Sequence, residues 1–255
     1  MSRTLRPGAE LAPGYEVIAH LKRTRVLDTY DVWSDERHAR CVAKTPRPEH
    51  VGEAGLRRAL AREARILASL THPHIVRVYE HLAKPQPVLI LETLQGATLA
   101  RMLEDSPRRR LATADLGWLG VHLCSALAYL HARRLVHLDL KPSNVISDRG
   151  QAKLIDFSIA RAPGRGRPGV GTPNYMAPEQ CDGGRVDAAT DVWGLGMVLF
   201  EAATGERGGP GAQLRGRRRL PREAVDAIEA SLAPARGARP SVADVEAALE
   251  ELAVD

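Results

Sequence analysis

The stretch "HLDLKPSN", residues 137–144, places Asp139 five positions before Asn144, with a lysine and a proline between them. The segment that starts at Asn144, "NVISDRGQAKLIDF", has the pattern of a β-hairpin with its turn at Asp148-Arg149-Gly150, and its last aspartate is Asp156. A carboxylate and an amide oxygen on neighbouring loops can hold magnesium on a phosphate chain, while a second carboxylate orients a hydroxyl nucleophile. The stretch and its hairpin therefore favour phosphoryl transfer, a reaction that needs mainly positioning and charge neutralisation.

The secondary-structure pattern of the chain changes near Gln95-Gly96. Before this point, short runs typical of strands surround one helical stretch, whereas helical periodicity dominates from Thr98 onward. Residues 161–170 are rich in Gly, Pro and Arg and are expected to form a loop, and Ser241 is expected to cap the last helix. Strands are predicted at 15–21, 29–33, 40–44, 75–82 and 87–92, and helices at 56–70, 98–105, 113–134, 191–205 and 241–252.

These patterns predict an α+β fold of two lobes, a small β-rich lobe and a larger, mainly helical one. We expect an N-terminal tail at 1–13, the first lobe at 14–94 and the second lobe at 95–255. The length of 255 residues, with 44% hydrophobic and 26% charged residues, suits one large domain or two packed lobes.

The net charge of +5 comes from 36 Lys and Arg against 31 Asp and Glu. Two arginine-rich runs, at 108–110 and 215–219, account for much of the excess, and such runs can form a nucleic-acid or acidic-lipid patch. Solvated loops are the favoured interpretation, because no aromatic residues are interleaved with the arginines. We therefore expect neither nucleic acid nor a membrane as a partner.

Three widely separated cysteines, Cys41, Cys124 and Cys181, predict neither a disulfide framework nor a zinc site. The N-terminus "MSRTLRPGAE" has no apolar segment of the signal-peptide type. The longest nearly apolar run, around "VWGLGMVLFEAA", is too short and too interrupted by glycine to span a bilayer. The expected location is the cytoplasm, and the pattern specifies no oligomeric state.

Five motifs in the same order identify a family resemblance. "HLDLKPSN" is similar to the catalytic loop H-R-D-x-K-P-x-N of protein kinases, "DFS" at 156–158 to D-F-G, and "GTPNYMAPE" at 171–179 to the end of the activation loop. "DVWGLG" at 191–196 resembles the family's central helix, and Arg239 the arginine that pairs with the glutamate of A-P-E, here Glu179. From about residue 14 to 253, the chain resembles a bacterial Hanks-type Ser/Thr protein kinase.

The resemblance implies a bilobal kinase fold that uses ATP and Mg²⁺ and acts on a protein substrate, with a regulatory protein as a further partner. It implies that Asp139 is the catalytic base, that Lys141 neutralises the transferring phosphate, and that Asn144 and Asp156 bind magnesium. His137 and Asp191 would brace the catalytic loop. Lys141 and Thr172, which corresponds to the threonine of the P+1 loop, favour Ser/Thr over Tyr as the acceptor.

In "CVAK", Lys44 would hold the α- and β-phosphates, paired with a glutamate of the helix at 56–70. Glu63 is the candidate, because Leu60, Glu63 and Leu67 share one helical face and a carboxylate on an apolar stripe needs a partner. A purely structural salt bridge is the alternative. The other residues that the resemblance assigns to nucleotide binding are Leu21, Thr29, Val42, the gatekeeper Leu91, and the hinge residues Glu92 and Leu94 on either side of Thr93.

The resemblance fails at the phosphate-covering loop. The family has G-x-G-x-x-G-x-V, whereas this chain has "KRTRVLDT" at 22–29, with Lys22, Thr24 and Leu27 in place of the glycines. Glycines let the backbone approach phosphate closely, so side chains here would weaken ATP binding or bind phosphate by their own charges. The D-F-G motif also differs, because Ser158 stands in place of its glycine.

Leu138 replaces the catalytic-loop arginine that normally binds a phosphorylated residue of the activation loop. Residues 159–171 also contain no hydroxyl side chain. Because the receiving charge and the phosphorylation site are both absent from these positions, we expect activity that does not depend on activation-loop phosphorylation.

Three functions compete. The favoured one is an ATP- and Mg²⁺-dependent Ser/Thr protein kinase, because Lys44, Glu63, Asp139, Asn144 and Asp156 are all present. The second is a pseudokinase that binds partners with weak or no catalysis, which the glycine-free loop favours. The third is a small-molecule kinase of the antibiotic-phosphorylating type, which the protein-substrate segment at 171–179 disfavours.

Overall fold

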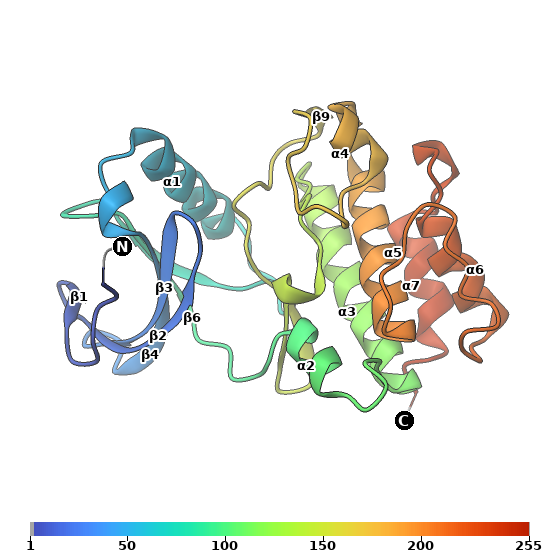
Figure 1. Ribbon diagram of the computed structural model, residues 1–255, viewed down its shortest axis with the longest axis horizontal. Coiled ribbons are helices and arrows are strands. Elements are labelled where there is room, and N and C mark those ends of the chain that lie inside the picture. The colour runs from blue at the N-terminus through green and yellow to red at the C-terminus, as the bar shows by residue number, and fades with distance from the viewer. Residues whose placement is uncertain (1–2, 255) are drawn as a thin grey trace. The chain divides into compact units, whose positions relative to one another are not determined.

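The computed structural model describes residues 3–254, and these form two compact units. The first unit consists of residues up to Thr71 together with Val76–Leu94. The second consists of the short segment His72–Ile75 and the residues from Gln95 onward. The first unit is mainly β-sheet and the second mainly helical, which confirms the predicted α+β class (Figure 1).

The first unit is a six-stranded antiparallel sheet in the order β1-β2-β3-β4-β6-β5, with helix α1 packed on β5 and β6 (Figure 1). Short connections join strands that are consecutive in the chain, except that α1 and the segment His72–Ile75 lie between β4 and β5. The elements are β1 (Glu10–Ala12), β2 (Tyr15–Arg23), β3 (Leu27–Ser34), β4 (Ala39–Pro46), a 3-10 turn (Pro48–His50), α1 (Ala54–Ala68), β5 (Val78–Leu82) and β6 (Val88–Glu92).

One face of this sheet forms the core of the first unit. Alternate residues of the strands point to the same face, and here these include Tyr30, Cys41, Ala43 and Ile90, each at most 3% exposed. The core extends to β1, within the segment 1–13 that was expected to be a tail. Leu11 and Ala12 are buried there, so this part of the chain gains apolar burial by pairing with β2.

The second unit is built on two long helices, α3 and α5, which pack against each other and against α7 and α6 respectively (Figure 1). Helix α5 is apolar on all sides and correspondingly buried from Thr190 to Phe200. The helices are α2 (Leu99–Asp105), α3 (Thr113–Ala132), α4 (Pro178–Asp182), α5 (Ala188–Thr204), α6 (Arg222–Ser231) and α7 (Val242–Glu250), with 3-10 turns at Pro142–Asn144 and Arg236–Ala238.

Two sequence predictions in the second unit are confirmed locally. Strands β7 (Val145–Asp148) and β8 (Gln151–Leu154) form the predicted hairpin, and its turn residues Arg149 and Gly150 both have positive φ, as a tight two-residue turn requires. Ser241 caps α7, because its side chain accepts a hydrogen bond from the backbone of Asp244.

The segment 161–170 differs from the expected loop. It contains a short strand, β9 (Gly164–Arg165), which pairs with β10 (Arg185–Val186). Gly183 makes this pairing possible, since a Cβ there would lie 2.6 Å from the ring of Pro168 and its φ is +70°. Among the helices of residues 3–254, none combines the length and the apolar character that crossing a membrane requires.

A cluster of neutral histidines holds the segment His72–Ile75 in the second unit. The rings of His74 and His122 stack with their centroids 4.1 Å apart. Nδ1 of His74 donates to the carbonyl oxygen of Ala152 at 3.0 Å, and Nδ1 of His122 accepts from the nitrogen of the same residue at 3.2 Å. Burial lowers the pKa of both rings, that of His122 to about 4. The cluster is therefore built for neutral imidazoles.

We predict that this cluster makes the protein acid-sensitive. Because the folded-state pKa of His122 lies below its unfolded value, its contribution to stability is complete above about pH 6.5 and is lost as the pH falls towards 4. Urea unfolding at pH 7.5, 6.0 and 5.0 measures this loss. The control is His122→Asn, whose Oδ1 can still accept from Ala152 but which does not titrate. A decline equally steep in both proteins would contradict the assignment.

Candidate active site

The catalytic loop brings its polar residues into direct contact. The Oδ2 atom of Asp139 accepts hydrogen bonds from Nζ of Lys141 at 2.7 Å and from Nδ2 of Asn144 at 2.9 Å. Asn144 also donates to the backbone oxygen of Asp139. Asp139 is 8% exposed and Asn144 2%, so a buried amide holds a carboxylate that is only slightly accessible to solvent.

Thr172 completes this arrangement from a distant part of the sequence. Its hydroxyl donates to Oδ1 of Asp139 at 2.6 Å and accepts from Nζ of Lys141 at 2.5 Å. Asp139, Lys141 and Thr172 therefore form a closed triangle of charge-assisted hydrogen bonds. An alcohol already donates to the Asp139 carboxylate, which is the contact that a hydroxyl nucleophile would make with a general base.

Asp191 fixes the backbone of the loop from the N-terminal turn of α5. Its Oδ1 accepts from the nitrogen of Leu138 at 2.8 Å, and its Oδ2 accepts from the nitrogen of His137 and from Nε2 of His131, both at 2.9 Å. Asp191 is 1% exposed, so three donors satisfy a fully buried carboxylate. Next to it, Gly194 allows close approach, because a Cβ there would lie 2.9 Å from that of Leu140.

Leu138 has a left-handed backbone, with φ of +69°. Its side chain packs with Val136 and Val186, against which Ile159 also packs. The side chain at position 138 is thus part of an apolar cluster that also includes Val186 of β10 and Ile159 at the start of the activation segment.

Asp156 and Asn144 lie on adjacent parts of the backbone. The backbone oxygen of Asn144 accepts from the nitrogen of Ile155 at 2.9 Å, and Asp156 follows with φ of +65°. The ring of Phe157 meets that of His137 edge-on, with centroids 4.8 Å apart. Burial lowers the pKa of His137, in keeping with a neutral ring that accepts from the nitrogen of Asp139.

A cavity of about 340 Å³ opens beside Lys141 and Thr172 in the second unit. Tyr175, Glu201 and Arg207 also line the cavity. The hydroxyl of Tyr175 donates to Glu201 at 2.6 Å, and the guanidinium of Arg207 lies 5.8 Å from the centre of the Tyr175 ring. The cavity is large enough to receive a side chain beside Lys141 and Thr172, both of which bind the Asp139 carboxylate.

In the first unit, Lys44 and Glu63 form the predicted ion pair. Nζ of Lys44 lies 3.0 Å from both Oε1 and Oε2 of Glu63, and Glu63 is 2% exposed. The strand register places Thr29 opposite Lys44 and Val42 opposite Leu91. Since cross-strand partners share a face, Thr29, Val42, Lys44 and Leu91 lie together on the face of the sheet opposite the core.

The remaining residues predicted to contact the nucleotide are also in the first unit. Leu21 lies on β2 and is 53% exposed. Glu92 ends β6, and its Oε1 accepts from the nitrogen of Arg77 at 2.8 Å. Leu94 is the last residue of the unit.

The segment 22–29 is a hairpin rather than a long loop. Lys22 pairs with Thr29 and Arg23 with Asp28, and three residues, 24–26, separate the end of β2 from the start of β3. The guanidinium of Arg23 binds both carboxylate oxygens of Asp28 at 2.8 Å, and His20 contacts the same carboxylate at 3.0 Å. Burial alone would raise the pKa of Asp28, but the hydrogen bonds from Arg23 and His20 lower it.

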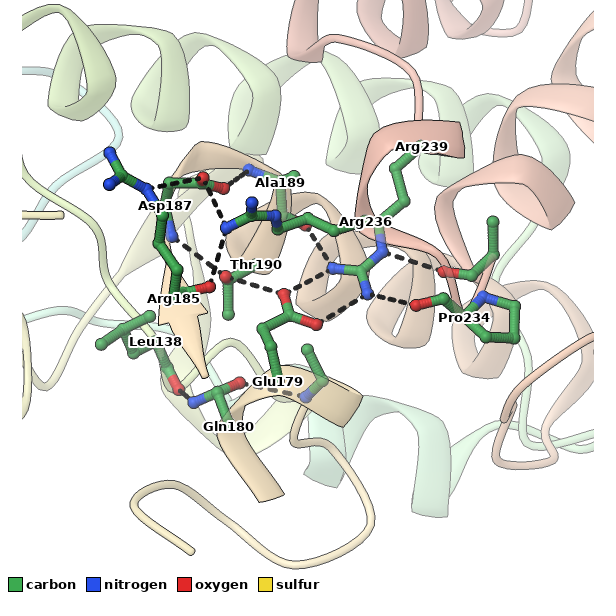
Figure 2. A network of polar contacts seen from close by, with 12 residues as sticks. Leu138, Glu179, Gln180, Arg185, Asp187, Ala189, Thr190, Pro234, Arg236 and Arg239 are labelled. Carbon is green, nitrogen blue, oxygen red and sulfur yellow. Dashed lines mark hydrogen bonds and ion pairs between the residues drawn. The ribbon is translucent and has the colours of Figure 1, made fainter. Parts of the chain in front are cut away.

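Figure 2 shows a polar network behind the catalytic loop. Arg239, whose side chain is fully buried, binds Glu179 through two hydrogen bonds at 2.7 and 2.8 Å, and Thr190 donates to the same carboxylate. Burial alone would raise the pKa of Glu179, but the bonds from Arg239 and Thr190 lower it. This geometry confirms the contact expected between Glu179 and Arg239.

Two polar residues of these sites have no counterpart in the sequence predictions. The sequence prediction includes Asp28 only as a member of the segment 22–29, whereas in the structure Asp28 anchors the hairpin through Arg23. Gln180 follows the A-P-E motif, and its side chain reaches the carbonyl of Leu138 (Figure 2). The register of the hairpin, which pairs Arg23 with Asp28, is a signal that could have identified Asp28 from the sequence. The partner of Gln180 is distant in the sequence, so only the fold reveals it.

Comparison with known proteins agrees with this geometry. A family model described as protein kinase domain matches residues 16–241, and the chain therefore belongs to the protein kinase family. It is 36% identical over 215 residues to the DNA damage-responsive serine/threonine-protein kinase RqkA of Deinococcus radiodurans, covering 79% of this chain and 31% of that protein. It is 38% identical over 163 residues to the serine/threonine-protein kinase PknB of Mycobacterium tuberculosis, covering 57% of this chain and 25% of that protein.

The fold resembles the crystal structure of the PknI kinase domain of Mycobacterium tuberculosis, with a TM-score of 0.78 and 24% identity over 98% of this chain and all of that one. This likeness confirms the predicted kinase fold. The chain spans less than a third of the length of RqkA and of PknB, so the comparison concerns the kinase domain of those proteins.

We predict that breaking the Glu179–Arg239 pair strongly destabilises the protein. Arg239→Ala would leave the buried Glu179 carboxylate without its main partner and should lower the free energy of unfolding by about 3–5 kcal/mol. The matched control is Arg236→Ala, which removes the more exposed ion pair with Asp187 and should cost less than about 1 kcal/mol. Urea denaturation followed by circular dichroism measures both. If the free energy of unfolding falls by the same amount in both variants, the prediction is wrong.

Proposed function

We propose that this protein transfers a phosphoryl group from ATP, with magnesium, to a serine or threonine hydroxyl of a protein substrate. The observation that carries the proposal is the Asp139 carboxylate, which accepts hydrogen bonds from Lys141, Asn144 and an alcohol, Thr172. Membership of the protein kinase family, with relatives named serine/threonine-protein kinases, supports the same reaction class.

In this proposal, Asp139 accepts the proton of the substrate hydroxyl as that oxygen attacks phosphorus. Its Oδ1 already accepts from an alcohol, so the carboxylate has the orientation that a general base needs. Lys141 lies 2.7 Å from Oδ2 and would neutralise negative charge on the transferring group. Thr172 positions both side chains, because its hydroxyl contacts each of them.

The residues for nucleotide and metal fit the expected chemistry. Because Nδ2 of Asn144 is used for Asp139, its Oδ1 is the atom left for a cation, and the Asp156 carboxylate would be the second protein ligand. Within residues 3–254 there is no cluster of three or more His, Cys, Asp or Glu that could hold a metal by itself. Magnesium commonly takes one or two protein oxygens and completes its shell with phosphates and water. When bound, ATP supplies the phosphoryl group and magnesium neutralises its charge.

In the first unit, Lys44 would bind the α- and β-phosphates. The bidentate contact with Glu63 holds the ammonium on the same sheet face as Thr29, Val42 and Leu91. The same family resemblance assigns all four positions to nucleotide binding, and the strand register, which places them on one face of the sheet, supports the assignment. Leu21, Glu92 and Leu94 are proposed as further contacts to the nucleotide.

The substrate side chain is proposed to use the cavity beside Lys141 and Thr172. The carboxylate of Glu201 in its wall is engaged by Tyr175, and the exposed Arg109 and Arg207 also line it. The cavity therefore presents charges of both signs, which suits a polar peptide segment of a protein substrate.

We further propose that this activity does not depend on activation-loop phosphorylation. The side chain of Leu138 is buried in an apolar cluster, where it offers no charge to a phosphate. Backbone hydrogen bonds order the segment instead, between Val136 and Arg161 in both directions and between Gly166 and Gly184. These contacts require no modification of the chain.

A pseudokinase that acts as a partner-binding module is the second candidate. The observation that favours it is the hairpin at 22–29, whose side chains replace the glycines and whose Arg23 is held by Asp28. A purified protein that binds ATP weakly and transfers no phosphate would support this candidate over the first.

We predict that Asp139→Asn folds normally but transfers phosphate about 10²–10⁴-fold more slowly, because it lacks the general base. Transfer of labelled phosphate to a generic Ser/Thr protein substrate measures the rate, and thermal shift with ATP and magnesium measures binding. Lys44→Met serves as the contrast, since it should reduce the ATP-dependent thermal shift while Asp139→Asn should keep it. Unchanged turnover of Asp139→Asn would eliminate the assigned base.

We predict that phosphate-free protein keeps its activity within about twofold. Phosphatase-treated protein, verified by mass spectrometry, is compared with untreated protein in the same transfer assay. A phosphate on Thr172 should instead inhibit, because its hydroxyl is committed to Asp139 and Lys141. If removing a phosphate from Ser158 or Thr172 abolishes the activity, and restoring that phosphate recovers it, the proposal is overturned.

A further inference from the structure

Gln180 connects the catalytic loop to the segment that carries Thr172. Its Nε2 donates to the backbone oxygen of Leu138 at 2.9 Å (Figure 2). The same nitrogen donates to the backbone oxygen of Val170 at 3.0 Å, and Oε1 accepts from the nitrogen of Ala177 at 3.0 Å. The residue is 4% exposed. Two carbonyl acceptors fix the orientation of the amide, because an oxygen in place of Nε2 would face two other oxygens.

The backbone of Gln180 holds the same segment. Its carbonyl oxygen accepts from the nitrogen of Gly169 at 2.9 Å. Gly171 lies directly against the amide, since a Cβ there would come within 3.0 Å of Nε2 of Gln180, and its φ of +146° also requires glycine. Gln180 therefore contacts three consecutive residues immediately before Thr172.

The two ends of this bridge are next to the reacting groups. Leu138 precedes Asp139, and Val170 lies two residues before Thr172. The bond of 2.6 Å between Thr172 and Asp139 closes a ring of contacts that runs through Gln180. A shift of either backbone segment would change the direction of the Asp139 carboxylate or of the Thr172 hydroxyl.

We propose that Gln180 is a positioning residue, whose neutral amide couples the activation segment to the catalytic loop and thereby aligns Thr172 with Asp139 and Lys141. The inference rests on the proposed kinase function and extends it to the mechanism of its phosphorylation independence. In a loop with arginine at position 138, a phosphate would join the same two segments by charge. Here the side chain at 138 is apolar, and an uncharged bridge joins them through backbone carbonyls.

The decisive variant is Gln180→Met, which has similar length but neither donor nor acceptor. We expect kcat for a protein substrate to fall by about 10- to 100-fold at a temperature where the variant is folded, because small misplacements of reacting groups cost about that much. The KM for ATP should change by less than about twofold, since the bridge contacts only the catalytic loop and the activation segment.

The matched control is Thr190→Val. Thr190 is 2% exposed and bonds Glu179 and the nitrogen of Asp187, and it does not contact the catalytic loop. It should lower the melting temperature, like Gln180→Met, but keep kcat within about twofold. If the two variants lose kcat equally, or if Gln180→Met keeps its kcat, the positioning role is refuted.

Gln180→Glu provides a pH test that a merely structural role would not pass. The carboxylate opposes two carbonyl oxygens, whereas the protonated acid can donate one hydrogen bond to them. The ratio of kcat for Gln180→Glu to kcat for the wild type should therefore rise as the pH is lowered from 8 to 6. A flat ratio would contradict the need for a donor at this position.

Hydrogen exchange tests the bridge without any activity. Backbone amides of 137–141 and of 169–173 should both exchange faster in Gln180→Met than in the wild type, while Thr190→Val should leave 137–141 unchanged. Unchanged exchange in Gln180→Met would overturn the bridge. If the wild type transfers no phosphate but the exchange result is as expected, the kinase proposal fails and the structural coupling stands.

Discussion

The left-handed backbone at Leu138 is the constraint on which the catalytic loop depends. A non-glycine residue with φ of +69° is strained by about 1–3 kcal/mol, and its neighbours must hold it there. Asp191 binds its N–H, Gln180 binds its carbonyl, and an apolar cluster encloses its side chain. This turn directs the next residue, Asp139, towards Lys141 and Thr172, so the geometry of the site follows from how one strained residue is secured.

Two buried polar residues, Asp191 and Gln180, support this turn, and a third, Arg239, binds Glu179 on α4; each of them is satisfied by several partners. Asp191 accepts from three donors, Gln180 uses both of its N–H groups and its oxygen, and Arg239 donates five hydrogen bonds to Glu179 and to backbone carbonyls. Buried polar groups stabilise a single arrangement only when all of their partners are present. Figure 2 shows that Glu179 and Gln180 are neighbours on α4, and of the two it is Gln180 whose side chain contacts the backbone of the catalytic loop.

In the first unit, ion pairs with buried carboxylates hold the hairpin at 22–29 and the side chain of Lys44 in place. A glycine-rich loop would be flexible, whereas the hairpin at 22–29 is tightened by an ion pair between Arg23 and the buried Asp28. The cross-strand pairs on the opposite face from the core keep Lys44 beside Glu63 and near Val42 and Leu91. The unit thus combines a lysine held by a buried glutamate with a hairpin constrained by an ion pair.

The sequence by itself determined the α+β class, the β7–β8 hairpin, and the pairs Lys44–Glu63 and Glu179–Arg239, through periodicity, turn chemistry and the order of motifs. It did not determine β1 or β9, because such short strands have no periodicity and depend on a partner strand for their hydrogen bonds. The bridge at Gln180 was decided only by the tertiary structure. An amide has no preferred partner in sequence, and its role arises when folding brings the carbonyls of Leu138 and Val170, 32 residues apart in the chain, within reach of one nitrogen.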